Sequence, residues 1–151
     1  MREAEPDPIY SHKLVTKLIN VTMSDGKKSV AQNQVYRAFD QVKEESKEEP
    51  LRVFLTAIDQ IKPNMEVRPR RVGGAAYQVP MPVRGARKES LAIRWLLQSA
   101  QKRSNKEYHT FAQKLAAEIL EASRGQGGAI TKKRDIERMA EANRAFSHFR
   151  W

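Results

Sequence analysis

The spacing of the apolar residues changes from a helical period to an alternating one after Pro63, and it changes back further along the chain. Within the changed segment Met65 and Val67 alternate with charged residues, which is typical of a strand with one buried face. A Gly-Gly pair at 73–74 interrupts the alternation, and a second extended run follows. Glycine readily adopts the positive φ angles of the tight turns in β-hairpins. The sequence therefore predicts a two-stranded β-ribbon at about 64–84.

Prolines limit where this ribbon can lie. Pro69, Pro80 and Pro82 fall inside the two extended runs, and proline has no backbone N–H to donate to a neighbouring strand. The ribbon therefore does not fit the middle of a sheet, and two strands alone are only marginally stable in water. We expect an arm with exposed edges, which either the helical part or a bound partner has to hold.

Helical periods fill the rest of the chain. Apolar residues three and four apart predict three amphipathic helices before the ribbon and three after it, at about 10–23, 31–42, 50–58, 87–103, 108–120 and 131–146. The 151 residues are enough for one domain but not comfortably for two. The predicted fold is mainly α: a short extended N-terminal arm at 1–9, then a single six-helix domain at 10–151 with the β-ribbon between the third and fourth helices.

Two large polar or aromatic residues fall on apolar helix faces. Trp95 lies inside the apolar stripe of the fourth helix, so we expect it in the core rather than stacked on a base. Asn143 lies on the apolar side of the sixth helix together with Met139. We interpret Asn143 as a hydrogen-bonded amide in the core.

The positive charge of the chain is concentrated in one stretch. The 28 Lys and Arg residues exceed the 18 Asp and Glu residues by ten, and residues 66–103 alone carry nine basic and two acidic side chains. Residues 41–60, with three basic and five acidic side chains, have a net charge of −2. A basic excess favours a polyanionic partner, most commonly nucleic acid, although an isolated charge run is usually a solvated surface. A cluster on a thin ribbon, beside Tyr77 and Gln78, favours nucleic-acid binding.

Further basic residues lie on the predicted helices. Arg87 and Arg94 are seven residues apart, so they share one side of the fourth helix. Three cations at 132–134 crowd the predicted start of the sixth helix, where they oppose the helix dipole. This pattern indicates either a function or a frayed, solvated first turn. Arg134 and Arg138 lie away from the apolar side, which predicts an exposed basic face.

Nothing in the sequence indicates catalysis, a cofactor or a metal ion. The chain has no cysteine, and His12, His109 and His148 have no metal-ligand spacing. The glycines fit helix ends better than a phosphate loop or a dinucleotide motif. No apolar run approaches the roughly 18–20 residues that a membrane span needs. We therefore expect a protein that is not an enzyme and has no membrane partner.

RNA suits the pattern better than DNA does. The second and third predicted helices, joined by a short link, are also compatible with a helix-turn-helix reader of DNA. That reading brings five acidic side chains toward the phosphates: Asp40, Glu44, Glu45, Glu48 and Glu49. A hairpin with arginine and tyrosine suits irregular RNA. Its prolines and exposed edges indicate that bound RNA holds the ribbon more than the helical body does.

Six sequence blocks then stand in the order of a known family: DGKKS at 25–29, RRVGG at 70–74, YQVP at 77–80, AIRW at 92–95, RMAEANRAF at 138–146 and HFRW at 148–151. Over about residues 7–151 the chain resembles small-subunit ribosomal protein seven of bacterial type. The resemblance implies a six-helix body with a β-ribbon. It also implies a structural ribosomal constituent that binds 16S-type rRNA as a primary binder and nucleates assembly of the subunit head. Its implied location is the ribosome, of the cytoplasm or of an organelle.

The resemblance also implies residue roles and partners. Contacts with rRNA are implied for Lys27, Lys28, Arg70, Arg71, Arg94, Lys102, Arg103, Lys133 and Arg134, and we add Arg84, Arg87 and Arg138 from the basic pattern. The ribbon is expected to point toward the exit-site tRNA and the mRNA path, close to Gly73, Gly74, Tyr77, Arg144, Arg150 and Trp151. Small-subunit ribosomal proteins nine and eleven are the implied protein neighbours.

The N-terminal arm departs from the family pattern. In relatives the arm is usually longer and rich in arginine, whereas residues 1–5 here contain two acids and one arginine. We therefore expect rRNA binding to depend on the other contacts. A free-standing regulatory RNA- or DNA-binding protein is the alternative function, and a regulator of that kind would separate from ribosomal subunits in high salt.

Overall fold

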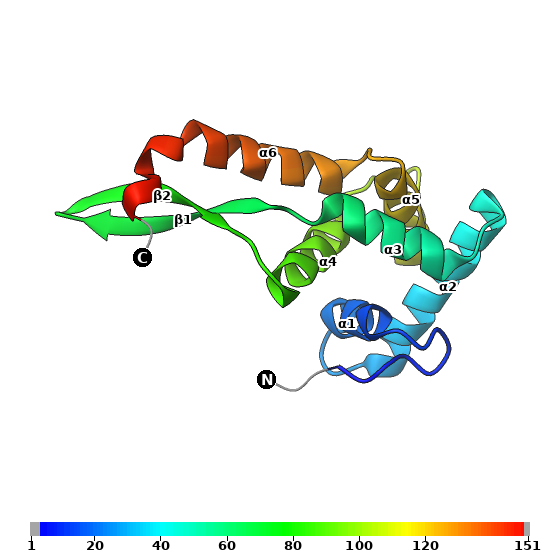
Figure 1. The fold of residues 1–151 in the computed structure, drawn as a ribbon. Helices are drawn as coiled ribbons and strands as arrows, with labels where there is room; N and C mark the ends of the chain where they lie inside the picture. The colour runs from blue at the N-terminus through cyan, green and yellow to red at the C-terminus, as the bar shows by residue number, and fades with distance from the viewer. Residues whose placement is uncertain (1–3, 150–151) are drawn as a thin grey trace.

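A computed structural model describes residues 4–149 and has the predicted mainly α fold, with a β-ribbon between the third and fourth helices (Figure 1). Within these residues there are six α-helices, two strands and a final 3₁₀ helix. Their bounds are α1 Lys13–Thr22, α2 Lys28–Ser46, α3 Pro50–Ile61, β1 Met65–Val72, β2 Ala75–Pro82, α4 Ala86–Gln101, α5 Phe111–Ser123, α6 Gly128–Ala142 and η1 Arg144–Phe149.

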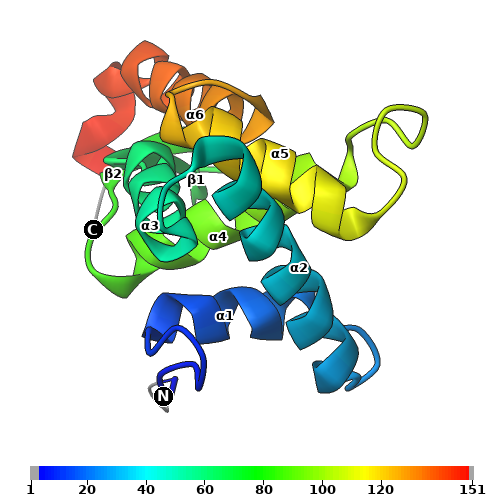
Figure 2. The same cartoon turned by 90° about the vertical axis from the view of Figure 1, so that its right-hand side faces the viewer.

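The core lies among the first five helices, which we call the body. Helix α5 packs against α2, α3 and α4, and α1 packs against α2 and α4 (Figure 2). Phe39, Phe54 and Ile119 are fully buried there. Burying one side chain of this size contributes about 1.5–3 kcal/mol. Trp95 is buried in the same cluster, so its predicted place in the core is confirmed.

Local chemistry sets the helix ends. Pro50 occupies the first turn of α3, where its missing N–H costs nothing, as the sequence indicates. Helix α5 begins at Phe111 rather than near Tyr108, because Thr110 and Gln113 form a reciprocal capping box. The prediction of a helix from 108 is wrong at that end, and Tyr108 is left in the preceding loop.

The end of the sixth helix also differs from its prediction. Helix α6 stops at Ala142, and the chain continues as the tighter helix η1. Asn143 is not a core amide: its Nδ2 donates to the Met139 carbonyl at 2.8 Å on an exposed helix end. A short amide side chain that satisfies a terminal carbonyl ends a helix in this way. Met139 itself is 44% exposed and does not belong to the core.

Asp7 connects the N-terminal segment to the body. Its buried carboxylate accepts hydrogen bonds from the backbone N–H groups of Ile9 and Tyr10, at 3.0 and 2.9 Å. The Tyr36 hydroxyl of α2 donates to the same carboxylate at 2.6 Å. Burial and this hydrogen bond to Asp7 raise the pKa of Tyr36 to about 12. Residues 8–10 form a turn, so the predicted arm at 1–9 is not extended throughout.

The ribbon is an antiparallel hairpin with a two-residue turn. Arg70 pairs with Tyr77, and Val72 pairs with Ala75, across Gly73 and Gly74. Both glycines have positive φ angles, 58° and 86°, which side chains other than glycine rarely adopt. The hairpin prediction is confirmed.

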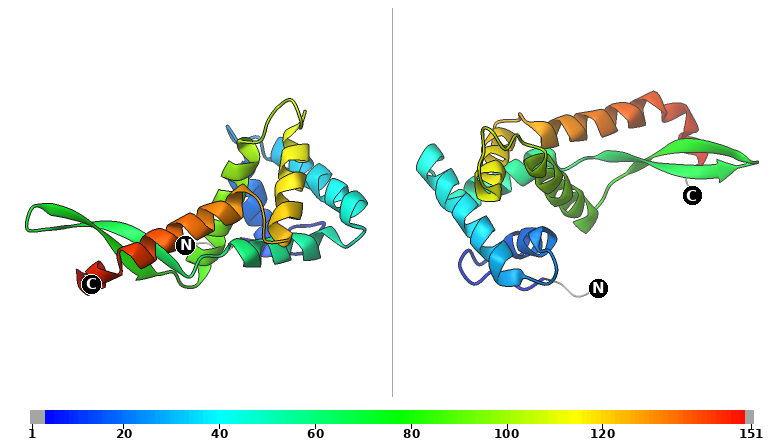
Figure 3. Two further views of the ribbon diagram at one scale, coloured as in Figure 1. Left: turned by 90° about the horizontal axis from the view of Figure 1, so that it is seen from above. Right: turned by 180° about the vertical axis from the view of Figure 1, so that it is seen from behind.

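The ribbon does not project alone, because the C-terminal segment lies along it. Helix α6 contacts both strands, and η1 folds back against β2 (Figures 1 and 3). The Tyr77 ring lies 5.0 Å from the Phe146 ring and 4.9 Å from the Phe149 ring, between centroids. We call the ribbon, α6 and η1 together the arm. The expectation that bound RNA holds the ribbon more than the protein does is therefore wrong for this side of the ribbon.

No helix within residues 4–149 is long and apolar enough to cross a membrane.

Candidate nucleic-acid interface

Helix α4 carries an exposed polar face that runs from the ribbon to the far side of the body. Arg87, Arg94, Gln98 and Gln101 are spaced by seven, four and three residues, so they lie along one side of the helix, and all are exposed. Arg87 and Arg94 therefore lie on the same side of α4, as the sequence predicts. The face places two guanidinium groups in solvent, which a phosphate backbone can reach.

Helix α1 adds a second cation to this face. Lys17 and Asn20 of α1 line a hollow of about 250 Å³ together with Arg94. The Lys17 Nζ atom lies 3.5 Å from Glu89 Oε2, so a carboxylate partly compensates this lysine. An ion pair as exposed as this is worth no more than about 1 kcal/mol, and a phosphate can compete for the lysine.

Helix α6 contributes a lysine that the sequence argument did not single out. Lys102, directly after α4, and Lys132 of α6 line a groove of about 420 Å³ between the two helices. Both lysines are exposed. The three cations at 132–134 pointed to this segment, but only the packing of α6 on α4 brings Lys132 beside Lys102.

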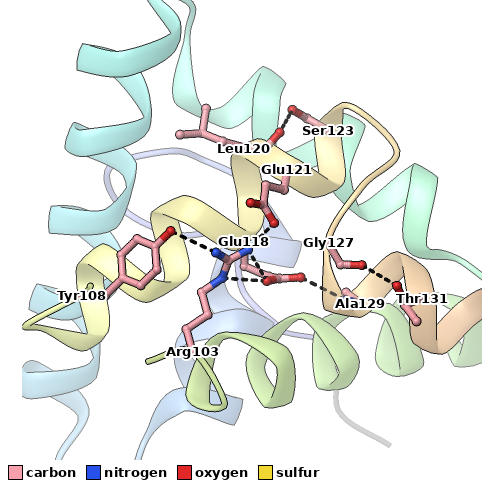
Figure 4. A network of polar contacts seen from close by, with 9 residues as sticks. All are labelled: Arg103, Tyr108, Glu118, Leu120, Glu121, Ser123, Gly127, Ala129 and Thr131. Carbon is pink, nitrogen blue, oxygen red and sulfur yellow. Dashed lines mark hydrogen bonds and ion pairs between the residues drawn. The ribbon is translucent and has the colours of Figure 1, made fainter. Parts of the chain in front are cut away.

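Arg103, a predicted rRNA contact, is instead part of a half-buried network (Figure 4). Its side chain is 14% exposed and forms ion pairs with Glu118 and Glu121. A terminal guanidinium nitrogen also donates to the Tyr108 hydroxyl at 3.2 Å. Burial alone would lower the pKa of Arg103, but hydrogen bonds to Glu121 and Glu118 outweigh it and raise the pKa. A guanidinium with this many protein acceptors stabilises the fold, and its contact with rRNA stays a prediction.

Glu118 links this network to the start of α6. Its side chain is 1% exposed, and its Oε1 accepts the backbone N–H of Ala129 at 2.9 Å. A carboxylate at a helix N-terminus is favourable because it complements the helix dipole. Because α6 begins at Gly128, the cations at 132–134 lie beyond its first turn. The unfavourable interaction of these cations with the helix dipole is therefore weaker than the sequence predicts.

Gly127 lets α6 approach this network. Its φ is 96°, and a Cβ atom there would lie 3.0 Å from oxygen atoms of Glu118 and Glu121. Any other residue would need both a strained backbone and a displaced carboxylate. Glycine is therefore needed at position 127 for the packing of α6, and not only to end the preceding helix.

The other predicted rRNA contacts on the helices lie at the start of α2 and along α6. Lys27 and Lys28 are exposed where α2 begins, and Lys27 lines a hollow with Gln101. Lys133 Nζ donates to the Gln60 carbonyl at 2.9 Å, which ties α6 to the end of α3. Arg134 and Arg138 are exposed on α6, where Arg134 donates to the Gly125 carbonyl at 3.2 Å. None of these contacts prevents RNA binding.

Residues at the ribbon vary in exposure. Arg84 and Arg71 are exposed, whereas Arg70 is half-buried. Arg68 is one of the nine basic residues at 66–103 but is not among the predicted rRNA contacts. Arg68 and Arg87 both donate from Nε to Glu66, at 2.6 and 3.1 Å. The alternation of the strand puts residues 66 and 68 on one face, which is the signal that was available for finding them.

The residues expected near the exit site lie on the arm. Gly73 and Gly74 are exposed at the ribbon tip, and Tyr77 packs on Phe146 as described above. Arg144 forms an exposed ion pair with Glu141 at 3.1 Å. Arg150 and Trp151 lie outside the described residues.

Acidic side chains gather at the other end of the molecule. The end of α2 and the start of α3 lie opposite the ribbon tip (Figure 1). We call the exposed acids of this region the acidic surface: Asp40, Glu44, Glu45, Glu48 and Glu49. The cations that face α4 and its neighbours form the basic surface: Lys17, Lys27, Arg68, Arg87, Arg94, Lys102 and Lys132. A helix-turn-helix built from α2 and α3 would present the acidic surface to DNA.

Comparison with known proteins identifies the family of this chain. The family profile described as "Ribosomal protein S7p/S5e" matches residues 1–144. The "Small ribosomal subunit protein uS7" of Carboxydothermus hydrogenoformans is 55% identical over 150 residues, covering 99% of this chain and 94% of that protein. The protein of the same name from Rhizobium leguminosarum bv. trifolii is 54% identical over the same shares. That of Helicobacter hepaticus is 51% identical over 151 residues, covering 100% and 96%.

These matches extend over nearly the whole chain, far beyond a single shared motif. They confirm the resemblance that the six sequence blocks indicate. Proteins of this family are structural and RNA-binding, and they are not enzymes. The chain therefore belongs to the ribosomal protein S7p/S5e family and is a structural, rRNA-binding constituent of the small ribosomal subunit.

Proposed function

We propose that this chain is a primary binder of 16S-type rRNA that nucleates assembly of the head of the small subunit. The observation that carries the proposal is the separation of the basic surface from the acidic surface. Phosphate contacts provide a large share of the affinity of such proteins, because each neutralised phosphate releases counterions. A protein whose basic surface is separate from its acidic surface binds RNA in one orientation, and this orientation is what an early assembly factor has to define.

The contacts that we propose lie on several elements that pack together. Helices α1, α4 and α6 and the base of the ribbon each contribute cations to the basic surface. Because α1 and α6 both pack against α4, and the ribbon packs against α6, the cations keep fixed spacings, which suits recognition of RNA by shape. Lys28, Arg70, Arg71, Arg84, Lys133, Arg134 and Arg138 complete the proposed rRNA contacts.

For the arm we propose a position near the exit-site tRNA and the mRNA path. The exposed tip at 72–75 is the part of the ribbon farthest from the body. Small-subunit ribosomal proteins nine and eleven are the proposed protein neighbours. Replacing 72–75 by a shorter turn should leave rRNA binding intact and speed the loss of exit-site tRNA from reconstituted subunits. Unchanged tRNA release would restrict the arm to rRNA or protein contacts.

A footprint of the purified protein on naked rRNA tests primary binding. We expect protection confined to the 3′ major domain, without any other ribosomal protein present. Absence of protection, or protection spread over all domains, would contradict primary binding. Co-sedimentation with subunits through high salt then separates an integral constituent from a free-standing regulator, which would be lost from the particle.

A further inference from the structure

Glu66 is a buried acid in the middle of the basic surface. It lies on β1, near the base of the ribbon, and its side chain is 7% exposed. Its Oε1 accepts from Arg68 Nε at 2.6 Å and from Arg87 Nε at 3.1 Å, and its Oε2 lies 3.0 Å from the same Arg87 nitrogen. One carboxylate thus holds two arginines, one from the ribbon and one from α4.

Both arginines are bound through Nε alone. Within residues 4–149 the terminal nitrogens of these two side chains make no hydrogen bond to another protein group. Each arginine side chain is 45% exposed. A guanidinium held at Nε still presents a pair of terminal N–H groups, and that fork is the shape that binds a phosphate through two hydrogen bonds.

Further hydrogen bonds connect the ribbon base and α4 beneath the two arginines. The backbone N–H of Val83 donates to the Asn64 carbonyl at 2.9 Å, which closes the base of the hairpin. Lys88 Nζ of α4 donates to the Asn64 side chain at 3.1 Å. The ribbon base and the first turn of α4 are therefore connected by two side-chain contacts, Glu66–Arg87 and Asn64–Lys88, which hold Arg68 and Arg87 next to each other.

We propose that Glu66 is a positioning residue that orients Arg68 and Arg87 as a clamp for an RNA phosphate at the junction of the ribbon and α4. Two adjacent guanidinium groups repel each other, and the carboxylate between them offsets this repulsion before RNA arrives. Fixing both side chains in advance lowers the entropy that binding has to remove. The proposal rests on the rRNA binding proposed above and adds one site to it.

The substitution Glu66→Gln separates this role from a simple charge effect, because the two predict opposite signs. Removing a negative charge from a basic surface should strengthen RNA binding if the charge alone matters. If Glu66 positions the clamp, we expect the affinity for a 3′ major domain rRNA fragment to fall about tenfold, the scale of one charged hydrogen bond. The slope of log affinity against log salt should also decrease in magnitude by roughly 0.7–0.9, the value for one phosphate.

Glu89→Gln is the matched control. Glu89 is the other acid between residues 66 and 103; it lies in the first turn of α4 and pairs with Lys17 instead of the clamp. Its removal makes the same change in net charge, so we expect unchanged or stronger binding. A folded Glu66→Gln variant that binds as tightly as the wild type, or that keeps the wild-type salt slope, would overturn the clamp.

A second variant decides the question if Glu66→Gln does not fold. Arg68→Lys keeps the charge at an exposed position but lacks the planar fork, so we expect nearly the loss that Arg68→Ala gives. Wild-type binding by Arg68→Lys would overturn the clamp. If the wild-type protein itself shows no salt-dependent rRNA binding, the proposed function fails. If the wild type binds rRNA, and Glu66→Gln and Arg68→Lys bind as tightly as the Glu89→Gln control, the clamp fails and the proposed function stands.

Discussion

The body and the arm of this protein are held together by different interactions. In the body, apolar side chains such as Phe39, Phe54 and Ile119 are fully buried among five helices. In the arm, α6 buries Ala129, Ile130 and Ala140, β2 buries Val79, and the ribbon is also held by three aromatic rings and by Glu66. The body therefore contains most of the buried apolar side chains. The arm has fewer buried side chains, so a single substitution can remove a large share of what holds it.

The largest effect is expected for a substitution in the body. Phe54→Ala removes a fully buried ring that packs on Phe39 with a centroid distance of 5.3 Å. We expect a loss of about 3–5 kcal/mol in the free energy of unfolding, from lost burial and from the cavity left behind. Denaturant unfolding measures it. A loss below about 1 kcal/mol would show that the body does not carry the stability.

A somewhat smaller effect is expected where the body meets the arm. Arg103→Met leaves the buried carboxylate of Glu118 without its cation, whereas Glu121 is exposed enough to be solvated. Breaking a buried ion pair on one side costs about 3 kcal/mol. We expect a lower melting temperature and faster amide exchange at the start of α6. Unchanged stability would mean that Arg103 is free to serve as an rRNA contact.

A third substitution acts on the arm alone. Phe146→Ala removes one ring of the cluster around Tyr77, and aromatic pairs of this kind contribute about 0.5–1.5 kcal/mol. Amide exchange should become faster in β2 while the amides of α5 keep their protection. If α5 loses protection to the same extent, the arm and the body unfold as one unit and the comparison fails.

The smallest effect on stability is expected near the ribbon tip. Arg71→Ala changes an exposed side chain, so the free energy of unfolding should stay within about 0.5 kcal/mol. Arg70 and Arg71 point to opposite faces of the strand, so alanine substitutions at the two positions should weaken rRNA binding unequally. Equal losses in two folded variants would count against the strand assignment.

Much of this fold follows from local patterns in the sequence. The helical periods, Pro50 and the Gly-Gly pair predict the order of the elements and the hairpin, because each acts over a few residues. The helix ends that the sequence predicted wrongly also have local causes, such as the capping box at Thr110 and the hydrogen bond from the Asn143 side chain to the Met139 carbonyl.

Other features depend on contacts between distant segments, which no local pattern contains. Arg103 looks like any other cation in the basic stretch until Glu118, fifteen residues later, is brought beside it. The packing of Tyr77 on Phe146 joins two residues that three helices, α4, α5 and α6, separate in the chain. The same holds for Lys132, which becomes a neighbour of Lys102 only when α6 packs on α4.

The most direct test of the account compares two charge-matched double variants in rRNA binding at several salt concentrations. Lys17→Ala with Arg94→Ala removes two cations from the basic surface, and Lys43→Ala with Arg52→Ala removes two exposed cations from the region of the acidic surface. We predict that the first pair loses more than about tenfold in affinity, with a salt slope smaller in magnitude by roughly 1.4–1.8. The second pair should bind like the wild type. Equal losses in both pairs would contradict the account, because net charge rather than the basic surface would then determine rRNA binding.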